Sequence, residues 1–260
     1  MRRSVLWVLA SLVLAASAVV SMPGASYARQ NRNAIMVSAS RSHPAGTDAL
    51  GRDRLVRVAA AFLLGLAGAL LASGLTTAAA GAVGMLAAFG RASLRWTLLL
   101  VCDVFLALPW LFLLMMVRSA LPLTTSPARS AAITFLVLAA LGWPASARAV
   151  YRGATQLRTS DWMLHARAAG LRNAGVVRHV IPNLFPLLVP QFLISIPAFV
   201  MAEANLGALG LGVGEPLPSW GGMLFELNNS PMLMQTRWVC LPVILLVLVL
   251  LLLEGVAAEA

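Results

Sequence analysis

Two carboxylates stand out because they lie in or beside long apolar runs. Asp103 falls inside one run, and Glu203 falls at the end of another, two residues before Asn205. A charged side chain in the middle of a bilayer costs about 2.5–3.5 kcal/mol on insertion scales, so such residues usually have a function. All three residues are candidates either for a polar translocation path or for hydrogen bonds that fix helix packing. Asp103 and Glu203 could also relay protons.

Other chemistry is not indicated. Neither a Ser-His-Asp arrangement with supporting motifs nor a CxxC or HExxH motif occurs, and the three histidines form no ligand cluster. Cys102 and Cys240 have no metal spacing and are expected to be small buried apolar residues. The chain has no lysine, so it cannot form a Walker A phosphate loop. We therefore predict no catalytic, cofactor-binding or metal site.

A polar segment at Tyr151–Pro182 separates two apolar runs, and six of the nineteen arginines lie between Arg148 and Arg178. Ser160 is a suitable N-cap, Asp161 a suitable first-turn acid and Gly170 a suitable C-cap. Between them, one apolar face at helical spacing is made of Trp162, Met163, Ala166 and Ala169. This pattern predicts a short amphipathic helix, which would lie on the lipid surface or dock into a groove of another protein.

The composition requires a membrane to position these residues. Hydrophobic residues make up 60% of the chain, charged residues only 11%, and the mean hydropathy is +0.86. Six apolar runs approach the roughly 20 residues that a helix needs to cross a bilayer. We predict an all-α polytopic membrane protein with about six transmembrane helices. The runs are Val5–Met22, Val58–Ala80, Trp96–Val117, Ala131–Val150, Leu184–Ala202 and Trp238–Val256.

The expected topology follows from alternating these runs. Residues 1–28 are either a cleaved secretory signal or a first transmembrane helix, and both readings place the 29–57 segment outside the cytoplasm. Residues 58–256 then form the transmembrane domain, with the 151–182 loop inside. The arginine counts support this only in part, because the 29–57 segment itself carries six arginines.

Two runs have unusual compositions. The second is rich in glycine, which predicts close packing against other helices. The fifth carries three prolines and follows a fourth, Pro182, and these prolines are expected to kink it. After it, the 206–222 stretch has too much glycine and proline for a regular span and is expected to be irregular and outward-facing. The glycines in the second run and just after it are Gly65, Gly68, Gly74, Gly81 and Gly84.

The polar loop resembles the EAA loop of bacterial ABC importer permeases, in which E-A-A-x-x-x-G is followed by I-x-P or L-P. Ala166, Ala168, Gly170 and the closing His179–Asn183 match this pattern. Further ordered stretches resemble the C-type subunit of the dipeptide/oligopeptide branch, so that the resemblance covers about residues 43–226. These stretches are His43–Asp53, Asp103–Trp110, Leu141–Gly153 and Glu203–Leu224.

This resemblance implies the fold of an ABC type I importer permease and a transport subunit without catalytic residues or cofactors of its own. It also implies four kinds of partner: a second homologous permease, two cytoplasmic ATPases that bind ATP and Mg²⁺, an extracytoplasmic substrate-binding protein, and membrane lipid. Nucleic acid is not an expected partner. The implied setting is the bacterial inner membrane, and the solute is a dipeptide, an oligopeptide or a related small solute such as a nickel chelate.

The ATPase-coupling residues carried over from the family lie in one short segment. Leu164 and His165 depart from the family pattern, because they stand where the family has Glu and Ala. Docking would then rest on Trp162, Arg167 and shape. The carried-over residues are Asp161, Trp162, Met163, Leu164, His165, Ala166, Arg167 and Gly170.

Two alternatives remain open from the sequence. One is a proton-coupled secondary transporter that uses Asp103 and Glu203, since glycine-broken spans also occur in such proteins. Inverted repeats would favour it, and none is evident. The other is a membrane scaffold without transport activity, if Leu164 marks a degenerate loop.

Overall fold

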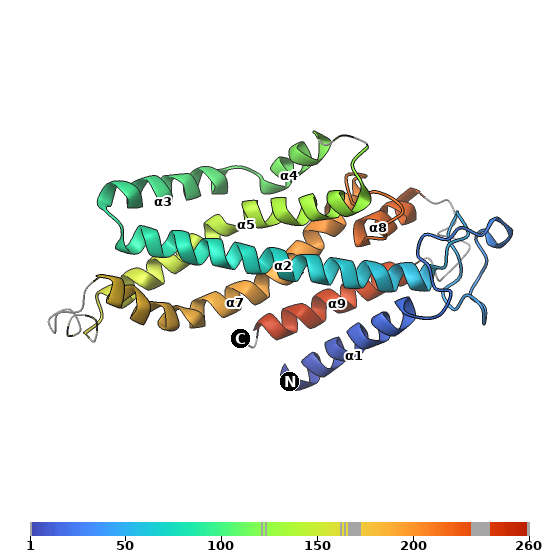
Figure 1. The fold of residues 1–260 in the computed structure, drawn as a ribbon, viewed down its shortest axis with the longest axis horizontal. Helices are drawn as coiled ribbons and strands as arrows, with labels where there is room; N and C mark the ends of the chain where they lie inside the picture. The colour runs from blue at the N-terminus through green and yellow to red at the C-terminus, as the bar shows by residue number, and fades with distance from the viewer. Residues whose placement is uncertain are drawn as a thin grey trace.

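The long helices of the computed structural model run roughly along one axis (Figure 1). The structure describes residues 2–120, 122, 124–161, 163, 165, 173–229 and 240–258. Within these residues the chain is helical apart from loops and one isolated bridge between Thr47 and Asp53, which confirms the all-α prediction. The helices are α1 (Arg2–Val20), the 3-10 turn η1 (Arg32–Ala34), α2 (Arg54–Phe89), α3 (Ala92–Ala107), α4 (Trp110–Ser119), α5 (Pro127–Arg158), α7 (Asn173–Ala208), α8 (Trp220–Asn229) and α9 (Leu241–Ala258).

Four of the described helices, α2, α5, α7 and α9, are long and apolar enough to cross a membrane. The bent pair α3–α4 supplies a fifth span if it is counted as one. The apolar part of α1, Ser4–Val20, is shorter, and at 1.5 Å per residue it extends about 25 Å. Each of the six predicted runs is thus mainly helical over its described residues, and the exceptions are Ser21, Met22, Leu108 and Pro109.

The third predicted span is not one continuous helix. It breaks between Ala107 and Trp110, and its two halves, α3 and α4, differ in direction by 79°. Pro109 causes the break, because proline lacks the backbone N–H of a helical turn and restricts Leu108 to the extended backbone that it adopts here.

The fifth run behaves differently, because α7 continues as a single helix through all four of its prolines, Pro182, Pro186, Pro190 and Pro197. The stretch expected to be irregular is so only at residues 209–219. After it the chain forms the ten-residue helix α8, which the sequence interpretation missed.

Close packing of the glycine-rich helix α2 is confirmed at three glycines. A Cβ atom at Gly65 would lie 2.9 Å from the Trp220 ring, at Gly68 2.2 Å from the Phe135 ring and at Gly84 2.7 Å from Val150. Gly74, by contrast, has open space around it. The most extensive contact in the fold is accordingly between α2 and α5.

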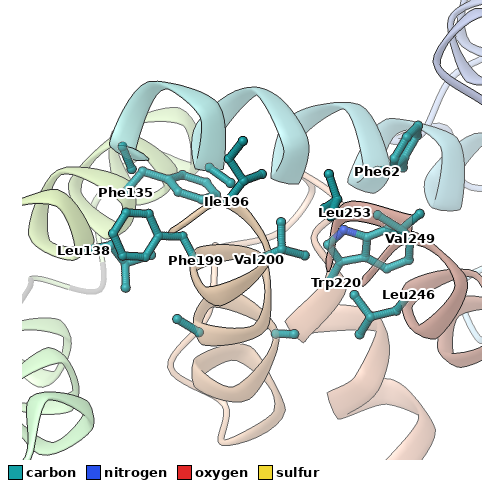
Figure 2. Close-up of a cluster of buried hydrophobic side chains, with 14 of the residues drawn as sticks. Phe62, Phe135, Leu138, Ile196, Phe199, Val200, Trp220, Leu246, Val249 and Leu253 are labelled. Atoms are coloured by element: carbon teal, nitrogen blue, oxygen red, sulfur yellow. The ribbon is translucent and has the colours of Figure 1, made fainter. Parts of the chain in front are cut away.

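The largest hydrophobic core lies where α2, α5, α7, α8 and α9 meet (Figure 2). Trp220, at the first position of α8, is 1% exposed and meets Phe62 edge to face, with ring centroids 6.5 Å apart. Both α2 and α7 contain 36 residues and extend about 54 Å, well beyond a hydrocarbon core of about 30 Å. These two helices therefore link the opposite ends of the molecule.

Candidate functional site

We call one end of the bundle the charged end; it comprises residues 31–57 and 207–229. Its first half is a compact loop in the 43–53 stretch. Asp53 caps α2 by accepting a hydrogen bond from the Val56 N–H (3.1 Å), and its other oxygen lies 2.9 Å from His43 Nδ1. The Thr47 hydroxyl donates to the Ala34 carbonyl (2.6 Å). The 43–53 loop thus forms a hydrogen-bonded platform at the start of α2.

Gly51 is needed for this loop to close. Its φ of +71° lies in the left-handed region, and a Cβ atom there would lie 1.9 Å from the Asn31 carbonyl oxygen. Asp48 completes the turn by accepting the N–H groups of Leu50 (2.9 Å) and Arg52 (2.8 Å). The Gly51 backbone conformation and the Asp48 hydrogen bonds therefore fix the backbone position of Arg52.

Two buried arginines connect this platform to the second half of the charged end. Arg52 and Arg57 are only 3% and 2% exposed. Arg52 pairs with Glu215 and, at 3.1 Å, with Glu226, while its Nε donates to Asp48 (2.6 Å). Arg57 lies 3.0 Å from Glu215 and 3.3 Å from Glu226. Three carboxylates thus surround two guanidinium groups, and we call these five residues the charge cluster.

The surroundings shift the pKa of two members of the charge cluster. Burial raises the pKa of Glu226 above its usual value, and Arg57 offsets part of that rise. Burial acts to lower the pKa of Arg52, but its hydrogen bonds to Glu215 and Asp48 outweigh this effect and raise it overall. The arginine therefore stays charged, while Glu226 is the member whose ionisation is penalised.

The charge cluster forms part of the wall of a cavity of about 640 Å³. Arg54 also lines it, together with glycine backbone from the 207–214 stretch and the apolar side chains of Met36 and Phe225. The lining of the cavity therefore combines charged and apolar side chains.

Glu203, one of the predicted residues, lies at the junction of α7 and α8. It is 1% exposed, and its Oε1 accepts a hydrogen bond from the Gly221 N–H (3.4 Å) in the first turn of α8. Ser219 caps the same helix by accepting from the Gly222 N–H (3.1 Å). A carboxylate at a helix N-terminus is favourable because the first N–H groups have no partner within the helix. Asn205, by contrast, is exposed.

The two helix backbones approach closely beside Glu203. A Cβ atom at Gly207 would lie 2.3 Å from the Gly221 Cα atom, so neither position has room for a side chain. Arg118, at the end of α4, holds the next turn of chain by donating to the carbonyl groups of Leu211 (2.8 Å) and Gly212. Its Nη1 also donates to the Ser130 hydroxyl at the start of α5 (2.8 Å). The 209–219 loop is thus bound to three helices.

The opposite end of the bundle, which we call the apolar end, holds the described residues of the predicted coupling segment, Asp161, Met163 and His165. Met163 is 0% exposed and packs into a cluster from the ends of α2, α5 and α7. Asp161 and His165 are exposed. The other predicted coupling residues lie outside the residues that the structure describes: Trp162, Leu164, Ala166, Arg167 and Gly170.

Three hydrogen bonds lie at the end of α5 beside this cluster. The Arg158 guanidinium donates to the Ala88 carbonyl of α2 (2.8 Å), which joins the two helix ends. The Ser160 hydroxyl donates backward to the Leu157 carbonyl (2.6 Å), while the Met163 N–H donates to the Ser160 carbonyl (3.0 Å). The buried members of the apolar end are Ala88, Val150, Ala154, Met163, Val180 and Leu184.

Asp103 does not meet Glu203. It forms an ion pair with Arg148 of α5, and the two side chains are 47% and 36% exposed. Cys102 beside it is buried, as expected, whereas Cys240 is half-buried.

The charge cluster was missed in the sequence, although three of the nine acidic residues belong to it. A signal was present: in a chain with so few charges, each acid near an apolar run needs a partner. The ion pairs of Arg52 and Arg57 with Glu215 and Glu226 join residues 158 to 174 positions apart, which no local pattern indicates.

Comparison with known proteins places this chain in a family. Residues 80–257 match the family described as "binding-protein-dependent transport system inner membrane component". This match covers the chain from the second half of α2 through α9, including the coupling segment and α8.

Individual relatives extend the match toward the N-terminus. The chain is 30% identical over 233 residues to an oligopeptide transport system permease protein OppC of Mycobacterium bovis, which covers 86% of this chain and 76% of that protein. Similarity to the protein of the same name from Escherichia coli K12 is 28% over 225 residues, covering 84% and 72%.

A third protein of that name, from Haemophilus influenzae, is 27% identical over 189 residues, which cover 71% of this chain but only 58% of the relative's length. Family membership also accounts for the apolar helices as those of a multi-pass inner-membrane protein. The chain belongs to the family of binding-protein-dependent transport system inner membrane components.

Proposed function

We propose that this chain is a permease subunit of an ATP-driven importer for dipeptides, oligopeptides or a related small solute. The observation that carries the proposal is the family match over residues 80–257, together with relatives that are named oligopeptide transport permeases. In this role the chain forms half of a translocation pathway, and a second homologous permease forms the other half.

The apolar end is the proposed site of coupling to ATP hydrolysis. The 161–170 segment would dock on a cytoplasmic ATPase, one for each permease, and these ATPases would bind the ATP and Mg²⁺ that the lysine-free chain cannot hold through a Walker A loop. Met163 supports this role, because it packs against the ends of three long helices. Displacement of the segment would therefore be transmitted to α2, α5 and α7 together.

The charged end is the proposed extracytoplasmic face, where a binding protein would deliver the solute. The 29–57 segment and α8 both belong to this end, in agreement with the topology expected from the alternating runs. The charge cluster would keep the loop after α7 closed against the start of α2 while the other end responds to ATP.

The proposal is tested by purifying the tagged chain in mild detergent and identifying its partners by mass spectrometry. A second permease and Walker-motif ATPases are expected, with the ATPases lost on Trp162→Asp and retained in the matched surface variant Arg29→Ala. Reconstituted complex should take up labelled peptides only with ATP. Gly170→Pro is expected to abolish uptake without preventing membrane insertion. A lone chain, or a homo-oligomer without ATPase, would contradict the proposal.

The proton-coupled alternative is less well supported. Asp103 is engaged by Arg148 and Glu203 by the first turn of α8, so neither contacts the other as neighbours in a relay would. Uptake driven by a pH gradient without ATP would revive it. Assembly with ATPases but without uptake would instead indicate a scaffold.

A further inference from the structure

The face of α3 around Asp103 is unusual for a membrane-spanning helix. Asp103 and Arg148 form an ion pair that remains 47% and 36% exposed in the isolated chain. Both lie within segments assigned to membrane spans, Arg148 in α5 and Asp103 in the α3–α4 pair. Charged side chains within spans almost always face the interior of a bundle or a water-filled cavity, so lipid is a poor neighbour for this face.

A second observation on the same helix pair leads to the same conclusion. The break at Leu108–Pro109 interrupts the ladder of backbone hydrogen bonds, and Leu108 and Trp110 beside it are exposed. Irregular backbone at membrane depth is tolerated only where protein or water covers it. Moreover, α3 buries only Cys102 and α4 only Leu114, so this part of the fold is largely uncovered.

The residues around the ion pair favour protein over water as the neighbour. Trp96, Leu100, Asp103 and Ala107 recur at helical spacing along one exposed stripe, and Val104 lies next to it. Trp96 and Val104 are 68% and 52% exposed. A mainly apolar stripe with a single polar group at its centre is typical of a helix–helix interface in which that group fixes the register of the partner.

We propose that the Asp103 face of α3 and the α3–α4 elbow pack against the second permease subunit, which buries the Asp103–Arg148 pair in the interface. This inference rests on the proposed function for the existence of that subunit. The occupant must itself be embedded in the membrane, which excludes the ATPases and the binding protein. The two charges neutralise each other, so the partner needs to present only apolar surface and a hydrogen-bonding group.

A photo-crosslinking amino acid at Val104 tests the proposal in the co-expressed complex. The matched control position is Leu251 of α9, which is apolar and 64% exposed. The expected result is an adduct with the second permease from position 104 and none from position 251. Adducts from position 251 but not from 104, or lipid adducts from 104, would overturn the proposal.

A thiol measurement separates an interface from an aqueous route. In a chain with Cys102 and Cys240 replaced by Ala, Val104→Cys should resist a membrane-impermeant thiol reagent. Rapid labelling in the assembled complex would place this face on the water-filled route and overturn the interface.

The ion pair itself gives a third measurement. Asp103→Ala leaves Arg148 without a partner and should lower the recovered second permease roughly tenfold or more, whereas Asp103→Ala with Arg148→Ala should recover most of it. An unchanged yield in the single variant contradicts the proposal. If the unaltered chain brings down no second permease, the proposed function and this inference both fall. If it does and position 104 gives no adduct, only the inference falls.

Discussion

The two ends of the bundle are stabilised by different physical means. At the charged end, Arg52 and Arg57 are buried among three carboxylates, and the contacts are directional. At the apolar end, Met163 packs in a cluster whose other buried members are alanine, valine and leucine side chains. Apolar packing is non-directional and tolerates small shifts, whereas breaking a buried ion pair leaves an uncompensated charge. We therefore expect the charged end to hold its geometry and the apolar end to be able to move.

The largest effect is expected from breaking the charge cluster. Arg57→Ala removes one of two cations from three carboxylates, and loss of a partner from a buried pair costs about 3–5 kcal/mol in the free energy of unfolding. Thermal unfolding in detergent should show a large fall, while the exposed Arg29→Ala should match the unaltered chain. Equal stability of the two variants would mean that the charged end is not held by its ion pairs.

The apolar end should respond less in stability and more in transport. Met163→Ala removes a fully buried side chain and should cost about 2–3 kcal/mol, near the low end for such substitutions because the site is at the edge of the bundle. Met163→Leu keeps the volume and serves as the control. ATP-dependent uptake should fall in the alanine variant and persist in the leucine variant; uptake lost equally in both would argue against a packing role.

The positions of the membrane helices could be predicted from the sequence alone. Hydropathy located every apolar run, because a bilayer imposes length and composition on each span separately. Pro109 is a visible reason to expect a break in the third run, because proline cannot continue the hydrogen-bond ladder of a helix. The charge cluster depends on how α2 and α7 bring distant loops together, so composition could indicate only that Asp48, Glu215 and Glu226 needed partners.

A smaller effect is expected where α7 and α8 cross. Gly207→Ala places a Cβ atom against the Gly221 backbone and should cost about 1–2 kcal/mol through overpacking. Gly74→Ala is the matched control, since it adds a methyl group to open space in α2 and should be neutral or mildly stabilising. Thermal unfolding of both variants checks this, and a destabilised Gly74→Ala alone would reverse the expected order.

The smallest expected effect is on the pH dependence of stability. Because the pKa of Glu226 is raised by burial, the folded state binds more protons than the unfolded state just above the ordinary pKa of the group. The contribution of Glu226 therefore stabilises the fold at low pH and is lost as the pH rises through this window. Unfolding temperatures between about pH 4 and 7 should show this downward slope weakened in Glu226→Gln. An identical slope in both proteins would assign the effect to other groups.

The sequence separation within the charge cluster also has a consequence for how the protein is made. Asp48 precedes both arginines, but Glu215 and Glu226 follow them by 158 to 174 residues. At translation rates of 5–20 residues per second, the arginines would wait roughly ten to thirty seconds before those partners are synthesised. Asp48 carries one negative charge against two arginines, so the remaining positive charge at the start of α2 can be neutralised only after α7 has been inserted and the chain has returned to the same end. Completion of the cluster would thus mark a fully inserted chain, and a nascent chain that stalls earlier would expose unpaired arginines to quality-control proteases.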